Sequence, residues 1–271
     1  PGETISSSAF KRSAGGKGAN QAAALAKAGM ETYFAGKAGA DGAFLRGLLN
    51  SYGVDTRYLR EYPGATGSAI IQLDASAQNS IILFAGGNGE ITLEEAGQTL
   101  SDFSAGDTVI LQNEIPLSAE IIKIAKARGL TVAFNPSPYD RRAESCPLDE
   151  VDILFVNEIE GAALAALPAS RGHEAALDAL LKRFPRAEIV LTAGKDGAYY
   201  AAQNNWAYAA PVPVEVADTT GAGDTFLGYF IAARARGFSP DKALSAACRA
   251  SSIAVSRAGA MEAIPLSDEV F

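Results

Sequence analysis

The stretch DTTGAGDTF at residues 218–226 is the most informative part of this chain. It runs directly into the apolar, helix-competent residues 225–235, so the backbone N–H groups of Gly221, Ala222 and Gly223 are expected at a helix N-terminus. Such an end carries partial positive charge and unsatisfied donors, and it therefore attracts anions. A carboxylate, Asp224, lies in the same turn. An anion-binding turn with an acid beside it suits a reaction in which a phosphate group meets a hydroxyl that must lose its proton.

Length and composition indicate one large, well-packed domain with at most a small appendage. The chain has 271 residues, of which 48% are hydrophobic and 20% charged. A net charge of −8 without a basic run disfavours nucleic-acid binding, and no apolar run approaches the roughly 18–20 residues of a membrane span. Cys146 and Cys248 match no zinc or disulfide spacing and are interpreted as reduced thiols of a cytoplasmic protein. The single histidine, His173, is assigned to the start of a helix rather than to catalysis.

Apolar strands alternate with amphipathic helices over most of the chain. We expect strands at residues 107–112, 131–134, 152–156 and 188–192, and helices at residues 117–128, 173–184 and 239–256. Gly129 is expected to end the helix that precedes it. Ser239 and Pro240 fit the first positions of a helix, and TLEE at 92–95 fits a capping box. The pattern predicts an α/β fold with a mostly parallel central sheet covered by helices on both faces. Ligands of such folds gather at the carboxyl ends of the strands.

A small second sheet is predicted apart from this body. Residues 67–84 have the pattern of a β-hairpin, with strands at 69–74 and 80–84 on either side of a polar turn. Residues 3–11 have a strand-like composition and are expected to belong to the same small sheet.

A second glycine-rich segment, GGKGANQAAALA, occupies residues 15–26. Glycines let the backbone approach a ligand closely, and the alanines predict a helix that packs tightly. Lys17 and Asn20 lie at the start of that helix, where they are placed to hydrogen-bond sugar hydroxyls. The segment lacks the G-K-[S/T] ending of a Walker loop. A glycine turn before a buried alanine helix, without a ligand, is the alternative interpretation.

Polar side chains also follow three of the predicted strands. Asn157 and Glu160 are spaced to hold the water shell of a magnesium ion, or Asn157 simply caps the next helix. The segment TAGKDG at residues 192–197 is either a tight turn or a loop that contacts a nucleotide. Glu114 either accepts a hydrogen bond from a ligand hydroxyl or is a solvated acid.

Taken together, GGKGANQAA and DTTGAGDTF, in this order and about 200 residues apart, resemble the paired signatures of the PfkB carbohydrate kinase family. The resemblance covers essentially the whole chain and includes GKAGADGAF at 36–44, LQNEIP at 111–116, NEIE at 157–160 and IAVSRAGA at 253–260. Lys17 and Gln21 favour the ribokinases within this family. The resemblance implies a ribokinase-like fold and a phosphotransferase that moves a phosphoryl group from ATP to the primary hydroxyl of D-ribose, which gives ribose 5-phosphate.

The resemblance also implies roles for individual residues. Asp224 is the expected general base, with Gly221, Ala222 and Gly223 as the anion hole for the transferring phosphoryl group. The positions that match sugar contacts are Gly15, Gly16, Lys17, Asn20, Glu114 and Asp224. The positions that match contacts to the nucleotide and its Mg²⁺ are Asn157, Glu160, Thr192, Gly194, Gly197 and Gly223.

Ribokinases also use a monovalent cation, typically K⁺, beside the anion hole. The matching positions, which act largely through backbone carbonyls, are Asp218, Thr220, Ala254, Arg257 and Gly259. Ala263 stands where ribokinases commonly present a serine, so one side-chain oxygen is absent from this site. We nevertheless expect K⁺ as an activator, because the other matching positions act largely through backbone carbonyls.

The small sheet matches the family's lid, which closes over the substrates and often makes the dimer contact. We assign residues 1–11 and 65–86 to a β lid, and residues 12–64 and 87–271 to an α/β domain that binds nucleotide and substrate. A homodimer through the lid is expected. Family members begin with a strand that ends in an Asn-x-Asp element, and this sequence starts at Pro1, after that element. We expect residues to be missing ahead of Pro1.

Alternatives remain open at this stage. One is another PfkB-type kinase whose acceptor is fructose, ketodeoxygluconate or a nucleoside, and a second is a non-catalytic sugar-binding protein on the same scaffold. A dinucleotide-dependent oxidoreductase is disfavoured because no strand-linked glycine fingerprint with a downstream acid is present. The expected ligands are a small sugar, ATP, Mg²⁺ and K⁺, with no nucleic acid and no membrane as partner.

Overall fold

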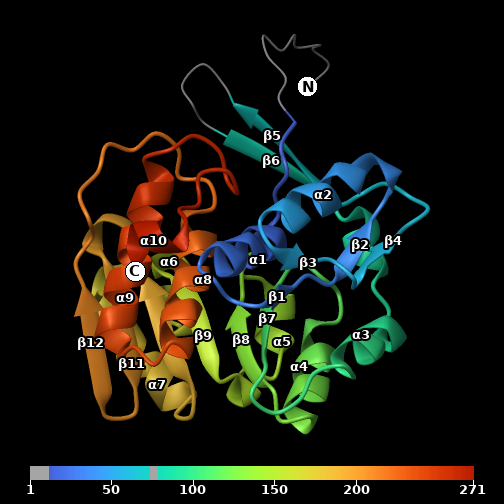
Figure 1. Cartoon of the computed structure of the whole chain (residues 1–271). Coiled ribbons are helices and arrows are strands. Elements are labelled where there is room, and N and C mark those ends of the chain that lie inside the picture. The colour runs from blue at the N-terminus through green and yellow to red at the C-terminus, as the bar shows by residue number, and fades with distance from the viewer. Residues whose placement is uncertain (1–11, 74–78) are drawn as a thin grey trace, which may run out of the picture.

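The computed structural model describes residues 12–73 and 79–271, and its largest sheet has the strand order β12-β11-β10-β9-β8-β7 (Figure 1). Four strands of this sheet run parallel: β7 (Thr108–Gln112), β8 (Thr131–Asn135), β9 (Ile153–Asn157) and β10 (Glu188–Thr192). Each lies where the apolar pattern predicted a strand. An antiparallel pair, β11 (Ala198–Ala202) and β12 (Asn205–Ala209), extends one edge. The turn before residue 198 was expected from the sequence, whereas β12 was not.

The helices cover both faces of this sheet. They are α1 (Lys17–Lys27), α2 (Ala43–Ser51), α3 (Leu93–Leu100), α4 (Ser118–Ala127), α5 (Arg141–Ser145), α6 (Glu158–Leu164), α7 (His173–Arg183), α8 (Ala222–Ala235), α9 (Pro240–Val255) and α10 (Ser267–Val270). The helices expected at 117–128, 173–184 and 239–256 are confirmed as α4, α7 and α9. Gly129 has a φ of 77° after α4, and Thr92 with Glu95 forms the predicted capping box of α3.

Two hydrophobic cores flank the sheet because side chains alternate along each strand. In β9, Phe155 points to the core that includes α1, α8 and α9, whereas Leu154 and Val156 point to the core that includes α3, α4, α6 and α7. In β10, Val190 belongs to the first core and its neighbours Ile189 and Leu191 to the second. Figure 1 shows α1, α8 and α9 side by side in front of the strands. This layered arrangement confirms the predicted α/β fold.

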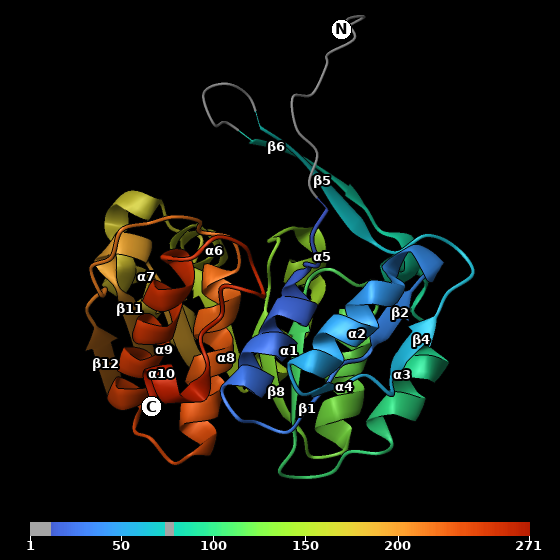
Figure 2. The ribbon, with the colours of Figure 1, turned by 45° about the horizontal axis from the view of Figure 1, so that its top comes forward.

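Within residues 12–73 and 79–271, three small two-stranded sheets accompany the main one. Two are parallel pairs: β1 (Thr32–Tyr33) with β3 (Val54–Asp55), and β2 (Gly36–Ala38) with β4 (Leu59–Glu61). The third is the predicted hairpin, in which β5 (Ser68–Leu73) pairs antiparallel with β6 (Asn79–Phe84). The hairpin projects away from the body of the molecule (Figure 2). The strand expected at 3–11 and most of the expected hairpin turn lie outside the described residues.

The packing of α8 against α1 and α9 decides where the glycine-rich segments meet. Gly228 of α8 lies so close to α1 that a Cβ built on it would come within 2.5 Å of the Ala24 Cβ. This close approach brings the first turn of α8 next to the first turns of α1, although the two segments are far apart in the sequence. Among the helices that the structure describes, none is both long enough and apolar enough to cross a bilayer.

Candidate active site

The DTTGAGDTF segment forms the N-terminus of α8, as predicted, but the helix begins at Ala222, one turn before the apolar run. Gly221 precedes it with a φ of 74°, a left-handed conformation that glycine adopts without strain. Asp224 therefore lies in the first turn of α8 itself, where the positive end of the helix favours a carboxylate. The start of α8 is therefore marked by the glycine at the turn and not by the first residue of the apolar run.

Two amides on α1 hold the Asp224 carboxylate. Asn20 donates from Nδ2 to Oδ2, and Gln21 donates from Nε2 to Oδ1, each at 2.8 Å. Burial raises the pKa of the Asp224 carboxyl, while the hydrogen bonds from Asn20 and Gln21 oppose that shift. Lys17 also lowers this pKa and Glu114 raises it. Asp224 is thus a desolvated carboxylate in a fixed orientation, which is the form a general base needs.

The turn before Asp224 offers backbone donors. The N–H of Ala222 donates to the Thr219 carbonyl at 3.2 Å, so this amide is already engaged. The amides of Gly221 and Gly223 have no hydrogen-bond partner among the residues that the structure describes. Of the three predicted anion-hole amides, these two are free to bind an anion at the positive end of α8.

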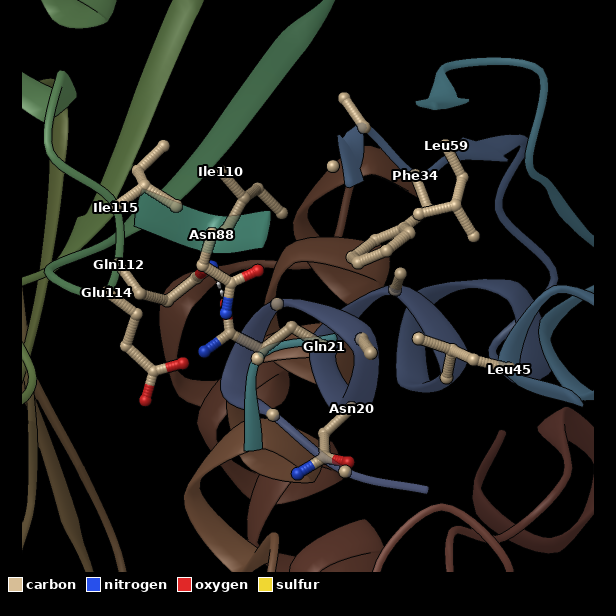
Figure 3. A pocket seen from close by; sticks show the side chains of 18 of the residues that line it. Asn20, Gln21, Phe34, Leu45, Leu59, Asn88, Ile110, Gln112, Glu114 and Ile115 are labelled. Carbon is tan, nitrogen blue, oxygen red and sulfur yellow. Dashed lines mark hydrogen bonds between the residues drawn. The ribbon is translucent and has the colours of Figure 1, made fainter. Parts of the chain in front are cut away.

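A large groove opens beside this turn, with a volume of about 2900 Å³. Asn20, Gln21 and Glu114 line it, together with Gly15 and Gly16 from the loop before α1. Figure 3 shows Asn20 and Gln21 on α1, and Glu114 on the segment that follows β7. Lys17 lies 3.7 Å from Glu114, measured from Nζ to Oε1. The structure therefore gathers the positions expected to bind a sugar around one groove, next to the residues that hold Asp224.

The residues expected to bind K⁺ lie where the loop before α8 meets the loop after α9. Asp218 accepts hydrogen bonds at Oδ1 from the Thr220 N–H and hydroxyl, at 2.9 and 2.7 Å, and at Oδ2 from the Gly259 N–H at 3.1 Å. At the end of α9, the Ala254 carbonyl accepts from the Arg257 N–H at 3.0 Å. The Arg257 side chain forms an ion pair with Glu269. The structure thus brings Asp218, Thr220 and Gly259 into direct contact.

Asn157 and Glu160 form a capping box at the start of α6. Asn157 Oδ1 accepts from the Glu160 N–H at 2.8 Å, and Glu160 Oε2 accepts from the Asn157 N–H at 3.0 Å. The helix-capping alternative for Asn157 is therefore realised. Glu160 is only 7% exposed, and its Oε1 has no partner among the residues described here. That oxygen remains available to a water molecule or to a hydrated ion.

The segment 192–197 forms a tight turn between β10 and β11, as one of its two interpretations expected. The Ala193 N–H donates to the Gly197 carbonyl at 2.9 Å, and Gly194 and Gly197 have φ values of 50° and 85°. Thr192 ends β10, so this turn lies at the carboxyl edge of the sheet, as does the N-terminus of α6.

His173 begins α7, where the sequence placed a helix start. Its Nε2 lies 3.6 Å from Asp196 Oδ2, and with Glu158 these side chains bring possible metal ligands within 4.8 Å of one another. Both carboxylates are exposed to solvent, and exposed acidic groups commonly gather without an ion.

Two residues that hold the site received no role from sequence reasoning. Gln21 bonds directly to Asp224, and Gln112, the last residue of β7, donates from Nε2 to Gln21 Oε1 at 2.5 Å. The sequence could have indicated Gln112, because this residue ends a predicted strand two residues before Glu114. Gln21 directly follows Asn20 on α1, but nothing local indicates that its side chain reaches α8.

Comparison with known proteins agrees with this geometry. The model of the pfkB family carbohydrate kinases matches residues 1–266. A ribokinase from Staphylococcus aureus is 34% identical, over all of this chain and 91% of its own length. The chain belongs to the pfkB carbohydrate kinase family.

Solved structures of this family show the same architecture. The ribokinase from Arabidopsis thaliana complexed with ribose and ATP has a TM-score of 0.87 and 32% identity, over all of this chain and 90% of that one. The ribokinase from Cryptococcus neoformans in complex with ADP has a TM-score of 0.87 and 34% identity, over all of this chain and 91% of that one. The predicted family and fold are confirmed, and the pfkB carbohydrate kinases are phosphotransferases that act on sugars.

Proposed function

We propose that this protein transfers the γ-phosphoryl group of ATP to the primary hydroxyl of D-ribose, with Asp224 as the general base. One observation carries this assignment: the Asp224 carboxylate is held at the N-terminus of α8, next to two free backbone amides and a groove lined by sugar-binding candidates. The similarity to ribokinases along the entire chain supports ribose as the acceptor.

The geometry supports a direct displacement in which each group has one task. Asp224 takes the proton of the acceptor hydroxyl as its oxygen attacks the terminal phosphorus, and the raised pKa of this carboxyl makes it a stronger base than an exposed aspartate. The amides of Gly221 and Gly223 stabilise the charge on the transferring group. Gly15, Gly16, Lys17, Asn20 and Glu114 bind the sugar. A positioned base contributes on the order of 10²- to 10⁴-fold.

The nucleotide belongs at the carboxyl edge of β9 and β10 in this proposal. Thr192, Gly194 and Gly197 contact it, and Gly223 contacts its phosphates. Asn157 and Glu160 organise a hydrated Mg²⁺, whose charge would screen the phosphates. The donor set fits such an ion, because Glu160 keeps one oxygen without a protein partner and Mg²⁺ retains several waters.

A K⁺ ion fits the loops beside the anion-binding turn. Asp218 and the backbone carbonyls at Thr220, Ala254, Arg257 and Gly259 supply oxygen ligands, which an alkali cation prefers to nitrogen or sulfur. The hydrogen bond from the Gly259 N–H to Asp218 Oδ2 supports this assignment because it holds the two loops together. The cation would stabilise the turn that carries Gly221 and Gly223.

The remaining parts of the proposal concern the lid and the assembly. Residues 1–11 and 65–86 act as a lid over the α/β domain of residues 12–64 and 87–271, and closure excludes water that would otherwise hydrolyse ATP. The described part of the hairpin exposes large apolar side chains, including Ile71, Ile82 and Leu83. Such a surface supports a homodimer through the lid, in a protein that we place in the cytoplasm.

The function is tested by a coupled ADP-release assay on the purified enzyme with ribose, deoxyribose, fructose, ketodeoxygluconate and nucleosides. We expect ribose to give the highest kcat/KM. A higher value for another acceptor would reassign the substrate and keep the kinase. Absence of ADP release with every acceptor would refute the proposal.

The role of Asp224 is tested by Asp224→Asn. This variant keeps the size of the side chain but cannot accept the proton, so turnover should fall by at least 10²-fold while ATP affinity by calorimetry stays near that of the wild type. A kcat close to the wild-type value would remove Asp224 as the base.

A further inference from the structure

We propose that Gln112 is a positioning residue for Asp224, and that it acts through Gln21. The inference rests on the proposed function of Asp224 as the base. It assigns a role to two glutamines that take no direct part in the chemistry of phosphoryl transfer. Gln112 comes from the end of β7, Gln21 from α1 and Asp224 from α8. One chain of hydrogen bonds thus links the central sheet to the catalytic helix.

The order of donors and acceptors along this chain fixes its direction. Gln112 donates from Nε2 to Gln21 Oε1 at 2.5 Å, and Gln21 donates from Nε2 to Asp224 Oδ1 at 2.8 Å. Figure 3 shows Gln112 and Gln21 facing each other across the groove, with their hydrogen bond dashed. An amide donates only through nitrogen and accepts only through oxygen. Because the carboxylate can only accept, Gln21 Nε2 faces Asp224, and the bond from Gln112 to the Gln21 Oε1 holds the amide in this orientation.

A reversed Gln21 amide would place its oxygen against a carboxylate oxygen. Gln21 is only 2% exposed, so water cannot relieve that repulsion. Nothing in the Gln21 side chain itself distinguishes the two orientations, since the amide group is nearly symmetric in shape. The bond from Gln112 stabilises the productive orientation, and it does so without contacting the acceptor hydroxyl.

Gly18 leaves the space that Gln112 occupies. A Cβ at Gly18 would lie 3.0 Å from Gln112 Oε1 and 3.5 Å from the Phe34 ring, so the end of the Gln112 side chain would have to shift slightly. The φ of Gly18 is not in the left-handed region, so its backbone does not require glycine. The third glycine of GGKG thus leaves room for the side chain of Gln112 beside α1.

The charged groups that face Asp224 are Lys17 on α1 and Glu114 after β7. Lys17 favours the ionised carboxylate and Glu114 disfavours it. Neither is altered by a substitution at Gln112 or Gln21, so a change in the titration of Asp224 in those variants reports on the relay.

The test measures the titration of Asp224 by carbon NMR of enzyme labelled at the aspartate carboxyl carbons, with Asp224→Asn to assign the signal. Gln112→Leu, Gln112→Met, Gln21→Leu and the double variant Gln21→Leu/Gln112→Leu are compared with wild type. The pH dependence of kcat/KM is measured for the same proteins. Gln98→Leu, on the exposed surface of α3, is the matched control for glutamine replacement.

We expect Gln21→Leu to raise the pKa of Asp224 by about one unit, because the ionised carboxylate loses a donor. Gln112→Leu should raise this pKa by less, because Gln21 still donates to Asp224 but its amide is no longer held at the oxygen. The acid limb of the kcat/KM profile should move upward with the pKa in each variant, which for Gln21→Leu is about tenfold in activity on that limb. Gln112→Leu should add little in the Gln21→Leu background, since the two residues act in series. Gln98→Leu should leave both measurements unchanged.

Gln112→Met separates a relay from simple packing. It fills a similar space without a charge and without a donor, so the shift should equal that in Gln112→Leu. If Gln112 only fills space, Gln112→Met is milder than Gln112→Leu, and the proposal is overturned. Equal titration of Asp224 in all five proteins would also overturn it. Because NMR reports on Asp224 without turnover, this result is independent of whether the enzyme accepts ribose.

Discussion

The contact between α1 and α8 can be tested with two glycine-to-alanine substitutions of opposite expected sign. Gly228 lies in the middle of α8, where an added Cβ would be 2.5 Å from the Ala24 Cβ and 3.1 Å from two backbone atoms of α1. Gly47 lies in α2, is exposed to solvent, and has nothing within 4 Å of the position its Cβ would take. The two changes are chemically identical and both occur within helices.

The expected magnitudes follow from helix propensity and packing. Alanine is favoured over glycine in a helix interior by about 1 kcal/mol, which is a gain in both variants. At Gly228, overpacking costs about 1–3 kcal/mol, and we expect the upper end because backbone atoms of α1 cannot move aside by rotation of a side chain. Gly228→Ala should thus lose about 2 kcal/mol of unfolding free energy, and Gly47→Ala should gain about 1 kcal/mol.

Thermal unfolding checks these values. At about 2–4 °C per kcal/mol, Gly228→Ala should melt roughly 4–8 °C below the wild type and Gly47→Ala roughly 2–4 °C above it. Kinase activity should fall in Gly228→Ala alone, because a displaced α1 carries Asn20 and Gln21 away from Asp224. A Gly228→Ala protein that melts at or above the wild-type temperature with full activity would refute the close-packing argument.

Three further predictions concern a capping box, the cation and the assembly. The ion pair with Lys37 at 2.8 Å, together with the bonds to Thr92, lowers the pKa of Glu95 to about 2. The ionised Glu95 stabilises the fold above the unfolded-state pKa of about 4.5, and this stabilisation is lost as the pH falls towards 2. In urea unfolding, Glu95→Gln should therefore be less stable than wild type at pH 7 but not near pH 2. Activity should rise when K⁺ replaces a large organic cation at constant ionic strength, and an unchanged rate would argue against the K⁺ site. Leu83, which is 65% exposed on β6, should support the dimer, so Leu83→Lys should sediment as a monomer; a wild-type monomer would contradict the lid contact.

Much of the fold follows from local patterns and was therefore predictable. The parallel strands β7 to β10 are short apolar runs, and α4, α7 and α9 have helical periodicity with clear end signals such as Gly129. The antiparallel edge strand β12 was missed because polar and apolar residues alternate only weakly in its sequence, NWAYA. Most of Asn205–Ala209 is also exposed at the border of the sheet. The start of α8 was placed too late, since the apolar run begins at residue 225 whereas the helix starts at the glycine turn.

The sequence by itself determined the family, the α/β class and the identity of the acid at the centre of the site, because glycine-rich turns and apolar periodicity are properties of neighbouring residues. Only the tertiary structure decided what holds that acid. Asn20 and Gln21 of α1 donate to Asp224 of α8, Gln112 of β7 donates to Gln21, and the side chain of Asn157 caps α6. The physical reason is that hydrogen bonds act over about 3 Å of space, whatever the separation along the chain. The packing of α1, α8 and β7 sets those distances, and no local pattern encodes them.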